Sequence, residues 1–455
     1  MPVVRPFEGP CREVLLQTLK AAPLQRISFA EWMELALYHP TCGYYVRAQD
    51  KIGRQHDFIT SSHVHSVFGK FWGARFAAWA GEKALELIEL GPGEGRLMGA
   101  LLDYMRDGAP NVYGRLTVYL YEISPYHRMK IKERLADHRA QLPIVFIDDL
   151  SDVPVKEARR ETDLCRIVFS NEFWDAHPVE RLRFLPEGGF ERQVVRLQDD
   201  DRWQLAWEPF ALHEPFAPHD PFDSSLSDPH KDPLFGEVFG KKRFYKRDAG
   251  TIGVDETEIS MPAAQIGEVL RLMGFHQDWQ STLRWLQEEV RLPAEELSAF
   301  MDDSDLQIVI EVPVLAYKTY QTVLGRLAPD TIVSIDYGAD QVGMILKALR
   351  GGSLRAFYAH TIRDDFWQYP GLMDMTVDVP FHLFIRAGES SGYETLAFKK
   401  QGAYLTEQGI FEWLRTPQDH DPFSAEARQN RAIVQLIQPG GMGDAFYVLL
   451  QKRHA

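Results

Sequence analysis

The sequence is poor in cysteine and in long apolar runs. Among its 455 residues are three cysteines, Cys11, Cys42 and Cys165, which lie far apart and show no Cys-x-x-Cys spacing. This pattern predicts neither a disulfide framework nor a zinc site, and it indicates a reducing, intracellular setting. No apolar run reaches the roughly twenty residues that span a bilayer, and Met1 to Lys20 contains Pro, Glu and Arg where a signal peptide has its apolar core. We therefore expect a cytoplasmic protein without a metal site and without membrane insertion.

Net positive charge is also lacking, since the formal net charge is −15. This balance argues against a phosphate-binding surface and hence against nucleic acid as a partner. A negative potential attracts cationic partners or cofactors over about 10 Å at ordinary salt, although the same charge also serves solubility. The hydrophobic content of 45% suffices for a sizeable core. The length fits one enlarged α/β domain or two domains.

One glycine-rich stretch provides the reference point for the rest of the chain. Leu85 to Leu90 mixes apolar and strand-forming residues, as a buried parallel strand does, and it leads directly into Gly91, Gly93 and Gly95. Glycines permit a tight turn and a close approach of the backbone to a ligand. A helix predicted from Leu97 to Met105 would direct its unpaired backbone N–H groups at the same ligand. The stretch therefore predicts a nucleotide-binding turn.

The spacing of these residues argues against a dinucleotide. The glycines follow Gly-x-Gly-x-Gly instead of Gly-x-Gly-x-x-Gly, and the next acidic strand end, Glu122, lies about thirty residues further on instead of about twenty. Both details disfavour NAD. They favour the class I methyltransferase form of the same architecture, in which a carboxylate at the end of the second strand holds the ribose hydroxyls of S-adenosylmethionine.

The next predicted strands also end in polar residues. Arg115 to Glu122 ends in a carboxylate, Pro143 to Ile147 is followed by Asp148 and Asp149, and Arg166 to Ser170 runs into Asn171-Glu172-Phe173-Trp174-Asp175. Because ligands of open α/β sheets bind outside the carboxyl ends of the strands, we expect these side chains to line one side of one cleft. The last stretch combines an amide, two carboxylates and two aromatic rings, which is unusual for a solvated turn.

The predicted elements form an α/β fold with a mostly parallel, Rossmann-like sheet. The last two strands, Glu394 to Lys400 and Asp444 to Lys452, are expected to form an antiparallel edge. Ser28 and Glu31 predict a capping box at the start of an N-terminal helix. We divide the chain into an N-terminal helical cap, a first part of the core, an inserted lid with helices, and a second part of the core, at 1–60, 61–210, 211–305 and 306–455.

Taken together, these stretches resemble a known family, the MidA-type S-adenosylmethionine-dependent methyltransferases. Its mitochondrial member is an arginine methyltransferase that assists assembly of respiratory complex I. The stretches that carry the resemblance are Ala36–Pro40 with Gly43–Tyr45, Asp57–Ser61, Glu89–Gly95, Asn171–Val179 and Ile335–Gly338. The sequence departs from the family at Ser62-His63, where the family shows Pro-Glu, and at Asp378-Val379-Pro380, where it shows His-Val-Asp.

The resemblance implies that S-adenosyl-L-methionine is the cofactor. In the class I arrangement, Glu122 holds the ribose hydroxyls, and Asp148 or Asp149 contacts the adenine amino group. The residues that the resemblance assigns to the cofactor are Glu89, Gly91, Gly93, Gly95, Glu122, Asp148, Asp149, Thr60 and Ser61.

The resemblance also implies a site for the methyl acceptor. Methyl transfer from a sulfonium needs a nucleophile aligned with the methyl carbon, so orientation supplies much of the catalysis. For an arginine acceptor, carboxylates would hold the guanidinium in a fork-like geometry, and one of them, first of all Glu172, would take the departing proton. We predict Glu172, Asp175 and Asn171 as catalytic residues. The predicted substrate-binding residues are Phe173 or Trp174 as a cation–π wall, Tyr44, Asp336 and Tyr337.

Three functions remain open at this point. The first is methylation of an arginine on a partner protein, which by the resemblance would be a respiratory-complex subunit. The second is methylation of a small molecule, with the Pro-rich segment from His213 to Asp255 closing over it. The third is a non-catalytic assembly factor that keeps the fold. A homodimer is compatible with all three.

Overall fold

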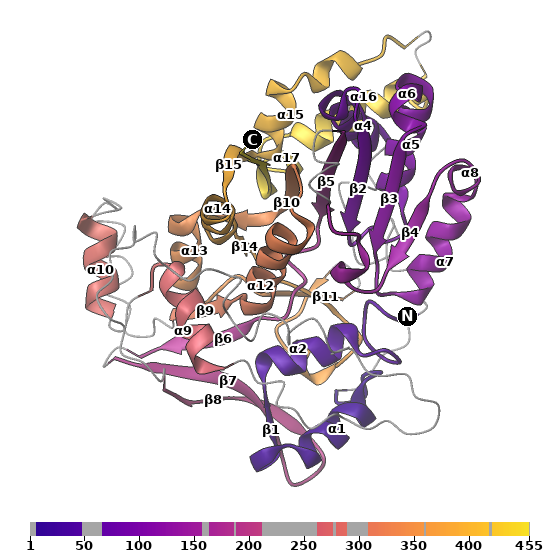
Figure 1. The fold of residues 1–455 in the computed structure, drawn as a ribbon. Helices are drawn as coiled ribbons and strands as arrows, with labels where there is room; N and C mark the ends of the chain where they lie inside the picture. The colour runs from indigo at the N-terminus through magenta and orange to yellow at the C-terminus, as the bar shows by residue number, and fades with distance from the viewer. Residues whose placement is uncertain are drawn as a thin grey trace. The chain divides into compact units, whose positions relative to one another are not determined.

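The computed structural model describes residues 6–47, 66–156, 163–185, 188–211, 262–275, 279–288, 308–358, 361–417 and 421–454. The chain divides into two compact units, each assembled from three separate segments of sequence (Figure 1). The cap unit comprises Met1–Arg47, Ala176–Thr319 and Ala339–Phe384, and the core unit comprises Ala48–Asp175, Tyr320–Gly338 and Ile385–Ala455. Within the described residues, no helix is both long and apolar enough to cross a membrane.

The core unit contains a path of seven strands in the order β15-β16-β10-β5-β2-β3-β4. Neighbouring strands from β10 to β4 pair in parallel, and β16 runs antiparallel to both β10 and β15. This arrangement confirms the mostly parallel sheet and the antiparallel pairing of the last two strands, with β16 lying inside the sheet edge. The strands are β2 Ala84–Leu90, β3 Leu116–Tyr121, β4 Ile144–Ile147, β5 Leu164–Asn171, β10 Thr331–Ala339, β15 Tyr393–Lys400 and β16 Phe446–Arg453.

Helices cover one face of this sheet and share a hydrophobic core with it. Trp72 of α4 lies at the centre, with its ring stacked on Tyr404 at 5.6 Å and tilted against Phe169 of β5 at 5.7 Å. A Cβ on Gly69 or Gly73 of α4 would lie under 3 Å from a backbone oxygen of α5, so these two glycines allow the close packing of the two helices. Helices of this unit are α4 Ser66–Ala80, α5 Arg96–Gly108, α6 Pro110–Tyr113, α7 Pro125–Arg134, α8 Ala136–Arg139, α15 Gln401–Glu407, α16 Ala425–Ile437 and α17 Met442–Ala445.

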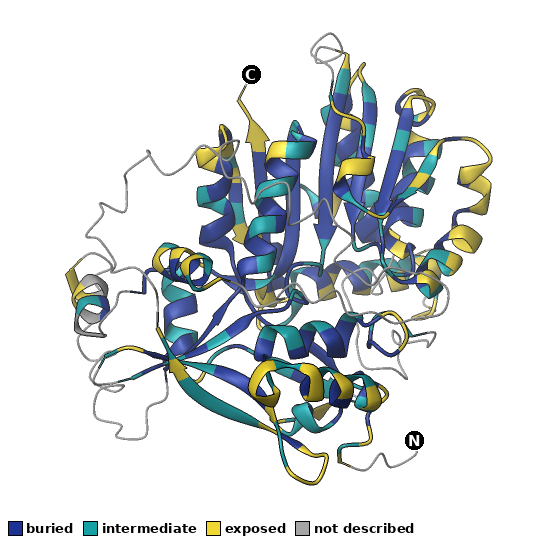
Figure 2. Cartoon of the chain, turned by 60° about the horizontal axis from the view of Figure 1, so that its bottom comes forward, coloured by how far each residue is buried: buried dark blue, intermediate teal, exposed yellow. Residues whose placement is uncertain are grey.

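Burial follows this layering (Figure 2). The central strands of the core sheet are buried along most of their length, whereas α7 and α8 present many exposed residues. The near-continuous apolar pattern of β2 and β5 is the pattern expected for parallel strands that are covered on both faces. Polar groups in these strands therefore stand out, and several of them lie at the carboxyl ends.

The cap unit contains a second sheet in the order β1-β7-β6-β9, with β8 paired to β7. Its strands β6 and β7 pair antiparallel and form a hairpin. The capping box is confirmed: the Glu31 N–H donates to Ser28 Oγ at 3.2 Å and the Ser28 N–H donates to Glu31 Oε2 at 2.6 Å. The strands of this sheet are β1 Arg26–Ser28, β6 Glu180–Phe184, β7 Phe190–Leu197, β8 Trp203–Phe210 and β9 Ile308–Val312.

Short strands and helices complete the cap unit. A three-stranded sheet has the order β12-β11-β13, and its strands are β11 Arg355–Tyr358, β12 Thr361–Ile362 and β13 Asp374–Thr376. The two-residue strand β14 is Val379–Pro380. The helices are α1 Arg12–Ala21, α2 Phe29–Tyr38, α9 Ala263–Leu272, α10 Trp279–Glu288 and α13 Gln341–Ala348, while α12 Val314–Thr322 and α14 Phe381–Ser390 each continue into the core unit.

These two units differ from the four parts predicted from the sequence. The prediction places residues 176–210, 308–319 and 339–384 in the core, but all three stretches belong to the cap unit. Strand pairing is the reason, because β6 pairs with β9 over Glu180–Phe184 and Ile308–Val312. Alternating sequence patterns identify strands, but they do not say which sheet a strand joins. The predicted lid lies largely in 212–261, outside the described residues.

The departure from the family at Asp378 has a structural explanation within the cap unit. The Asp378 side chain is buried and forms ion pairs with Lys347 and, at 2.7 Å, with Arg355. Its backbone N–H donates to Ser353 Oγ at 3.0 Å. Two cations therefore compensate this buried carboxylate, and the residue has a clear packing role.

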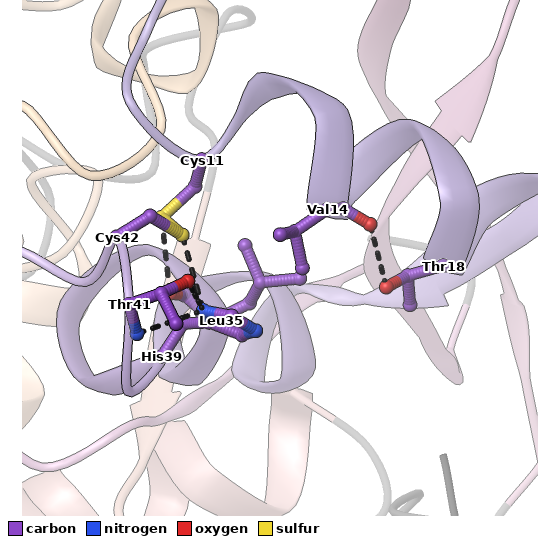
Figure 3. Close-up of a disulfide and its surroundings, with 7 residues drawn as sticks. All are labelled: Cys11, Val14, Thr18, Leu35, His39, Thr41 and Cys42. Carbon is purple, nitrogen blue, oxygen red and sulfur yellow. Dashed lines mark hydrogen bonds between the residues drawn. A yellow bond between two sulfur atoms is a disulfide. The ribbon is translucent and has the colours of Figure 1, made fainter. Parts of the chain in front are cut away.

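The cysteine prediction was wrong. A disulfide joins Cys11, just before α1, to Cys42 in the turn after α2, with 5.1 Å between the two Cα atoms (Figure 3). Cys42 Sγ also lies 3.2 Å from Nδ1 of His39, whose pKa is lowered by burial. The two cysteines are 31 positions apart in sequence, and only the packing of α1 beside α2 brings them together. Cys165 is free and buried.

We predict that reduction of this disulfide destabilises the protein. Opening the closed loop restores chain entropy to the unfolded state and typically costs about 2–4 kcal/mol. Urea unfolding with and without a reductant should show a lower midpoint in the reductant, because the bond is accessible once the chain unfolds. A Cys11→Ser variant should unfold at the lower midpoint under both conditions, and equal midpoints for the wild-type protein would contradict the prediction.

Candidate active site in the core unit

The glycine turn connects β2 to α5 as predicted. Gly91, Gly93 and Gly95 all have positive φ angles, of 69°, 54° and 72°, which glycine adopts at little cost. A Cβ on Gly91 would lie 2.8 Å from Cδ2 of Phe173, whereas a Cβ on Gly93 would meet no atom within 4 Å. No side chain caps the N-terminus of α5. The turn is therefore closed by an aromatic ring at Gly91, and it presents open backbone at Gly93.

Glu122 is fixed beside this turn at the end of β3. Its Oε2 accepts a hydrogen bond from the Gly93 N–H at 3.1 Å, and its Oε1 accepts one from the Ser124 N–H at 2.7 Å. Nδ1 of His127 lies 3.6 Å from Oε2. The Glu122 side chain is buried, and these two backbone donors hold its carboxylate at the carboxyl end of the strands, beside the glycine turn. This geometry suits the predicted contact with the ribose hydroxyls.

Glu89 is the most unusual group of the site. It lies in β2 between Leu120 of β3 and Phe169 of β5, and its side chain is 2% exposed. Among the described residues, Oε2 has no hydrogen-bond partner. Burial, reinforced by repulsion from Glu122, raises the pKa of Glu89 to about 8. A group of this kind in a parallel sheet is costly unless a ligand compensates it.

The two acidic residues after β4 have different environments. Asp148 is highly exposed, and its Oδ1 lies 2.7 Å from Nη2 of Arg128, which also donates to the Ile147 carbonyl at 2.9 Å. Asp149 instead caps a short turn, because its Oδ1 accepts from the Ser151 N–H at 2.7 Å. Of the two alternatives for an adenine contact, Asp148 is therefore the one with an accessible carboxylate.

The stretch after β5 contains a strained residue. Glu172 has a φ of 55°, and this left-handed conformation costs a residue other than glycine about 1–3 kcal/mol. The Glu172 N–H donates to the Ile335 carbonyl at 2.9 Å, and Nδ2 of Asn171 donates to Glu172 Oε1 at 2.9 Å. These two hydrogen bonds hold the strained backbone and orient the Glu172 carboxylate. Backbone strain of this kind is often retained at functional positions.

Asp336 of β10 holds the rest of this stretch in place. Its Oδ2 accepts hydrogen bonds from the N–H groups of Phe173, Trp174 and Asp175, at 3.1, 2.8 and 3.3 Å, and its Oδ1 accepts one from the Tyr337 N–H at 2.9 Å. Burial raises the pKa of Asp336, the Trp174 N–H lowers it, and repulsion from Glu172 raises it further. The side chain has no exposed surface. It therefore positions the loop, and its predicted contact with a substrate stays a prediction.

The aromatic residues of the stretch also divide. Trp174 is buried, and its Nε1 donates to Ser170 Oγ at 2.9 Å and to Ser334 Oγ at 3.2 Å. It is a core residue, and its predicted role as a cation–π wall stays a prediction. Phe173 is partly buried and lies edge-on to Tyr121, with 6.3 Å between the ring centroids. Phe173 is thus the aromatic residue of the pair that lies at the glycine turn.

The remaining predicted site residues are spread over different environments. Asp175 is buried beside Asp336, and the Tyr337 ring packs on Phe446 at 4.0 Å. Tyr44 belongs to the cap unit, where it is buried and packs edge-on against Tyr45. The predicted contacts from Thr60 and Ser61 lie outside the described residues.

Sequence reasoning missed the groups that support these side chains. Ser124 caps α7 and bonds Glu122, and Arg128 bonds the Glu122 carbonyl as well as Asp148. The Ser124-Pro125 pair is a recognisable helix start, so the capping role of Ser124 could have been predicted from the sequence. Nothing in the sequence indicates that Ser170 and Ser334, on neighbouring strands, share the indole N–H of Trp174.

Three comparisons relate this chain to known proteins. A family model described as “Putative S-adenosyl-L-methionine-dependent methyltransferase” matches residues 71–399. The chain is 24% identical over 445 residues to the mitochondrial protein arginine methyltransferase NDUFAF7 of Danio rerio, covering 92% of this chain and 82% of that protein. The human protein of the same name is 29% identical over 231 residues, which are 45% of this chain and 50% of that protein.

Among solved structures, the chain is similar to a COG1565 superfamily member from Burkholderia thailandensis with S-adenosyl-homocysteine bound. The TM-score is 0.66 at 23% sequence identity, and the match covers 97% of this chain and 92% of that chain. At this identity the likeness establishes the fold.

The environment of Glu89 predicts a specific pH dependence of stability. Its pKa in the folded protein, about 8, is above the ordinary value of 4.5, so the folded state binds the proton more strongly than the unfolded state does. Stability should therefore fall as pH rises from 4.5 to 8, by up to about 1.4 kcal/mol per pH unit. In Glu89→Gln this loss should disappear, and urea unfolding of both proteins at pH 6 and pH 8 measures the difference. Parallel pH profiles would exclude the assignment.

The four hydrogen bonds to Asp336 predict that Asp336→Asn is destabilising. The amide can replace only one oxygen as an acceptor, which leaves a backbone N–H facing an NH₂ group at a cost of about 1–3 kcal/mol. Thermal unfolding measures this loss. A matched control is Asp340→Asn, because Asp340 is an exposed helix cap and asparagine caps about as well. Equal losses of stability in the two variants would show that the buried hydrogen bonds to Asp336 contribute no more than an exposed helix cap does.

Proposed function

This chain belongs to the family of S-adenosylmethionine-dependent methyltransferases, and we propose that it methylates an arginine side chain of a partner protein. The membership confirms the resemblance inferred from the sequence, and with it the cofactor. The curated relatives are named protein arginine methyltransferases, which supports the choice of acceptor. A subunit of a respiratory complex is the first partner to test, because the resemblance suggests it.

The core unit fits the cofactor in four respects. The glycine turn presents open backbone at Gly93, the Glu122 carboxylate is held beside it, and α5 begins without a side-chain cap. Asp148 offers an accessible carboxylate after the next strand. These groups lie in sequence along one edge of the sheet, at β2, β3 and β4, which is the edge where open α/β sheets bind ligands.

The observation that carries the arginine proposal is the position of Glu172 relative to the glycine turn. Phe173, the next residue, packs directly on Gly91. Glu172 therefore lies just after the end of β5, beside the glycine turn that is proposed to bind the cofactor. Asn171 holds one carboxylate oxygen at 2.9 Å. A carboxylate fixed in this way can pair with a guanidinium in a defined orientation.

The mechanism assigns each step to a residue of the chain. When bound, S-adenosylmethionine supplies a methyl group activated by the positive sulfur. Glu172 orients the guanidinium and accepts the proton that the attacking nitrogen loses. Asn171 fixes the Glu172 carboxylate, Phe173 offers its ring to the cation, and Asp336 holds the backbone of the stretch. We propose Asp175 as the second carboxylate near the acceptor.

One experiment separates the three possible functions. The purified protein is incubated with S-adenosylmethionine carrying a labelled methyl group and with a lysate of its host. Label on one protein, located at arginine, supports the proposal. Label in the small-molecule fraction would replace it with small-molecule methylation. Binding of the cofactor without any labelled product would favour an assembly factor.

The cellular location and the oligomeric state are also proposals. We propose a cytoplasmic protein, although the relatives are named as mitochondrial. Fractionation of the host cell tests the location, and light scattering of the purified protein tests for a homodimer.

We predict that Glu172→Gln retains cofactor binding and loses turnover. The amide keeps the shape and the contact with Asn171, but it cannot accept a proton, and loss of a general base typically costs about 10²–10⁴-fold in rate. Calorimetry with S-adenosyl-homocysteine and the labelling assay measure the two quantities separately. The control is Glu133→Gln on the exposed face of α7, which should match the wild-type protein. Retained turnover in Glu172→Gln would leave Glu172 with a structural role only.

A further inference from the structure

Two carboxyl groups are buried side by side at the cofactor edge of the core sheet. Glu89 and Glu122 are 2% and 7% exposed, and the charge of Glu122 repels that of Glu89. Glu122 has two backbone N–H donors, from Gly93 and Ser124. Glu89 Oε2 has no partner in the described part of the chain. One of the two carboxyls is therefore compensated by the protein, and the other is left to a ligand or a proton.

The surroundings of Glu89 supply no cation among the residues that the structure describes. Its neighbours on the adjacent strands β3 and β5 are Leu120 and Phe169. The helices α4 and α5 turn apolar side chains toward the sheet, among them Val67, Phe68, Phe71, Leu97 and Leu101. A neutral carboxyl group fits this environment far better than an isolated carboxylate does.

The charged groups nearby are engaged elsewhere. His127 lies against Glu122, at 3.6 Å. Arg128 bonds the Glu122 carbonyl and pairs with Asp148. Two further arginines near the turn, Arg96 and Arg134, pair with Glu94 at 2.9 and 3.8 Å.

We propose that Glu89 carries a proton in the empty site and releases it to solvent when the cationic amino-acid end of the cofactor binds. The O–H bond of the carboxyl group breaks, its electron pair stays on the oxygen, and the resulting carboxylate faces the ammonium group. Cofactor binding is thereby linked to the loss of one proton. The inference rests on the cofactor alone, so it holds or fails independently of the arginine acceptor.

The order of the strands points to the amino-acid end. Asp148 follows β4, Glu122 follows β3 and Glu89 lies near the end of β2. With adenine at Asp148 and ribose at Glu122, the cofactor continues along the edge toward β2, and the part beyond the ribose is the methionine portion. Its ammonium group is a cation that can compensate Glu89 in a site of low dielectric constant.

The linkage gives a pH dependence with a definite sign. Burial and Glu122 keep Glu89 protonated up to a pKa of about 8, so at lower pH a proton must leave before the ammonium group can pair with the carboxylate. Affinity should therefore rise with pH, by up to about tenfold per unit below pH 8, and level off above it. Glu122 repels Glu89 and is itself in contact with His127, so the Glu89 variant is needed to assign the effect.

Calorimetry tests this proposal without any turnover. S-adenosyl-homocysteine, which has the ammonium group and no methyl to transfer, is titrated into the protein at pH 6.5 in phosphate and in Tris. The two buffers differ in their heat of protonation, so the difference in binding enthalpy counts the protons released. We expect close to one proton for the wild-type protein and none for Glu89→Gln. Equal enthalpies in the two buffers for the wild-type protein, or an unchanged difference in the variant, would overturn the proposal.

Two further arms make the assignment specific. Methylthioadenosine lacks the amino-acid portion, so it should bind without releasing a proton, and release with this ligand would refute the role of the ammonium group. Glu94→Gln changes a buried carboxylate in the same turn that already pairs with Arg96, and it should leave the proton count unchanged. If Glu89→Gln does not bind the ligand, the test rests on the wild-type protein alone. The number of protons that it releases must fall toward zero above pH 9, where Glu89 is already ionised before the ligand binds.

Discussion

The candidate site depends on one buried carboxylate, that of Asp336. The strands β5 and β10 pair in parallel up to Asn171 and Ile335, and beyond that point the chain after β5 has no ladder to follow. Asp336 replaces the ladder by accepting three successive backbone N–H groups of that chain. Buried backbone donors need partners, so a single side chain determines the path of the whole stretch. The strained conformation of Glu172 persists because both of its flanks are fixed.

Charge is distributed unevenly along this edge of the sheet. Asp336 and Glu122 are carboxylates whose oxygens accept backbone N–H groups, Asp148 pairs with an arginine, and Glu89 is left uncompensated within the described part of the chain. The protein thus satisfies the groups that shape the site and leaves one group for the ligand. Binding sites typically contain such a buried group without a partner in the protein, and the bound cofactor then stabilises it.

The sequence predicted the core sheet because its signals are local. An apolar strand, three glycines and a helix lie close together in the chain, and each strand end carries its own acid. Sheet membership was not predictable in the same way, since β6 and β9 are far apart in the chain. The burial of Asp336 and Trp174 was not predictable for a related reason: residue type suggested an exposed site, and burial depends on the neighbouring strand. The pairing of Cys11 with Cys42 likewise requires the packing of two helices.

The contact between Gly91 and Phe173 has a consequence for how the site can change. A Cβ at position 91 would lie 2.8 Å from that ring. The glycine turn, which is proposed to hold the methyl donor, therefore packs directly against the stretch that is proposed to hold the methyl acceptor. A larger side chain at this position would collide with the ring and would also be strained by the positive φ of Gly91. Glycine is therefore required here by the backbone as well as by the ring, and a smaller residue at position 173 alone would not allow a larger one in the turn.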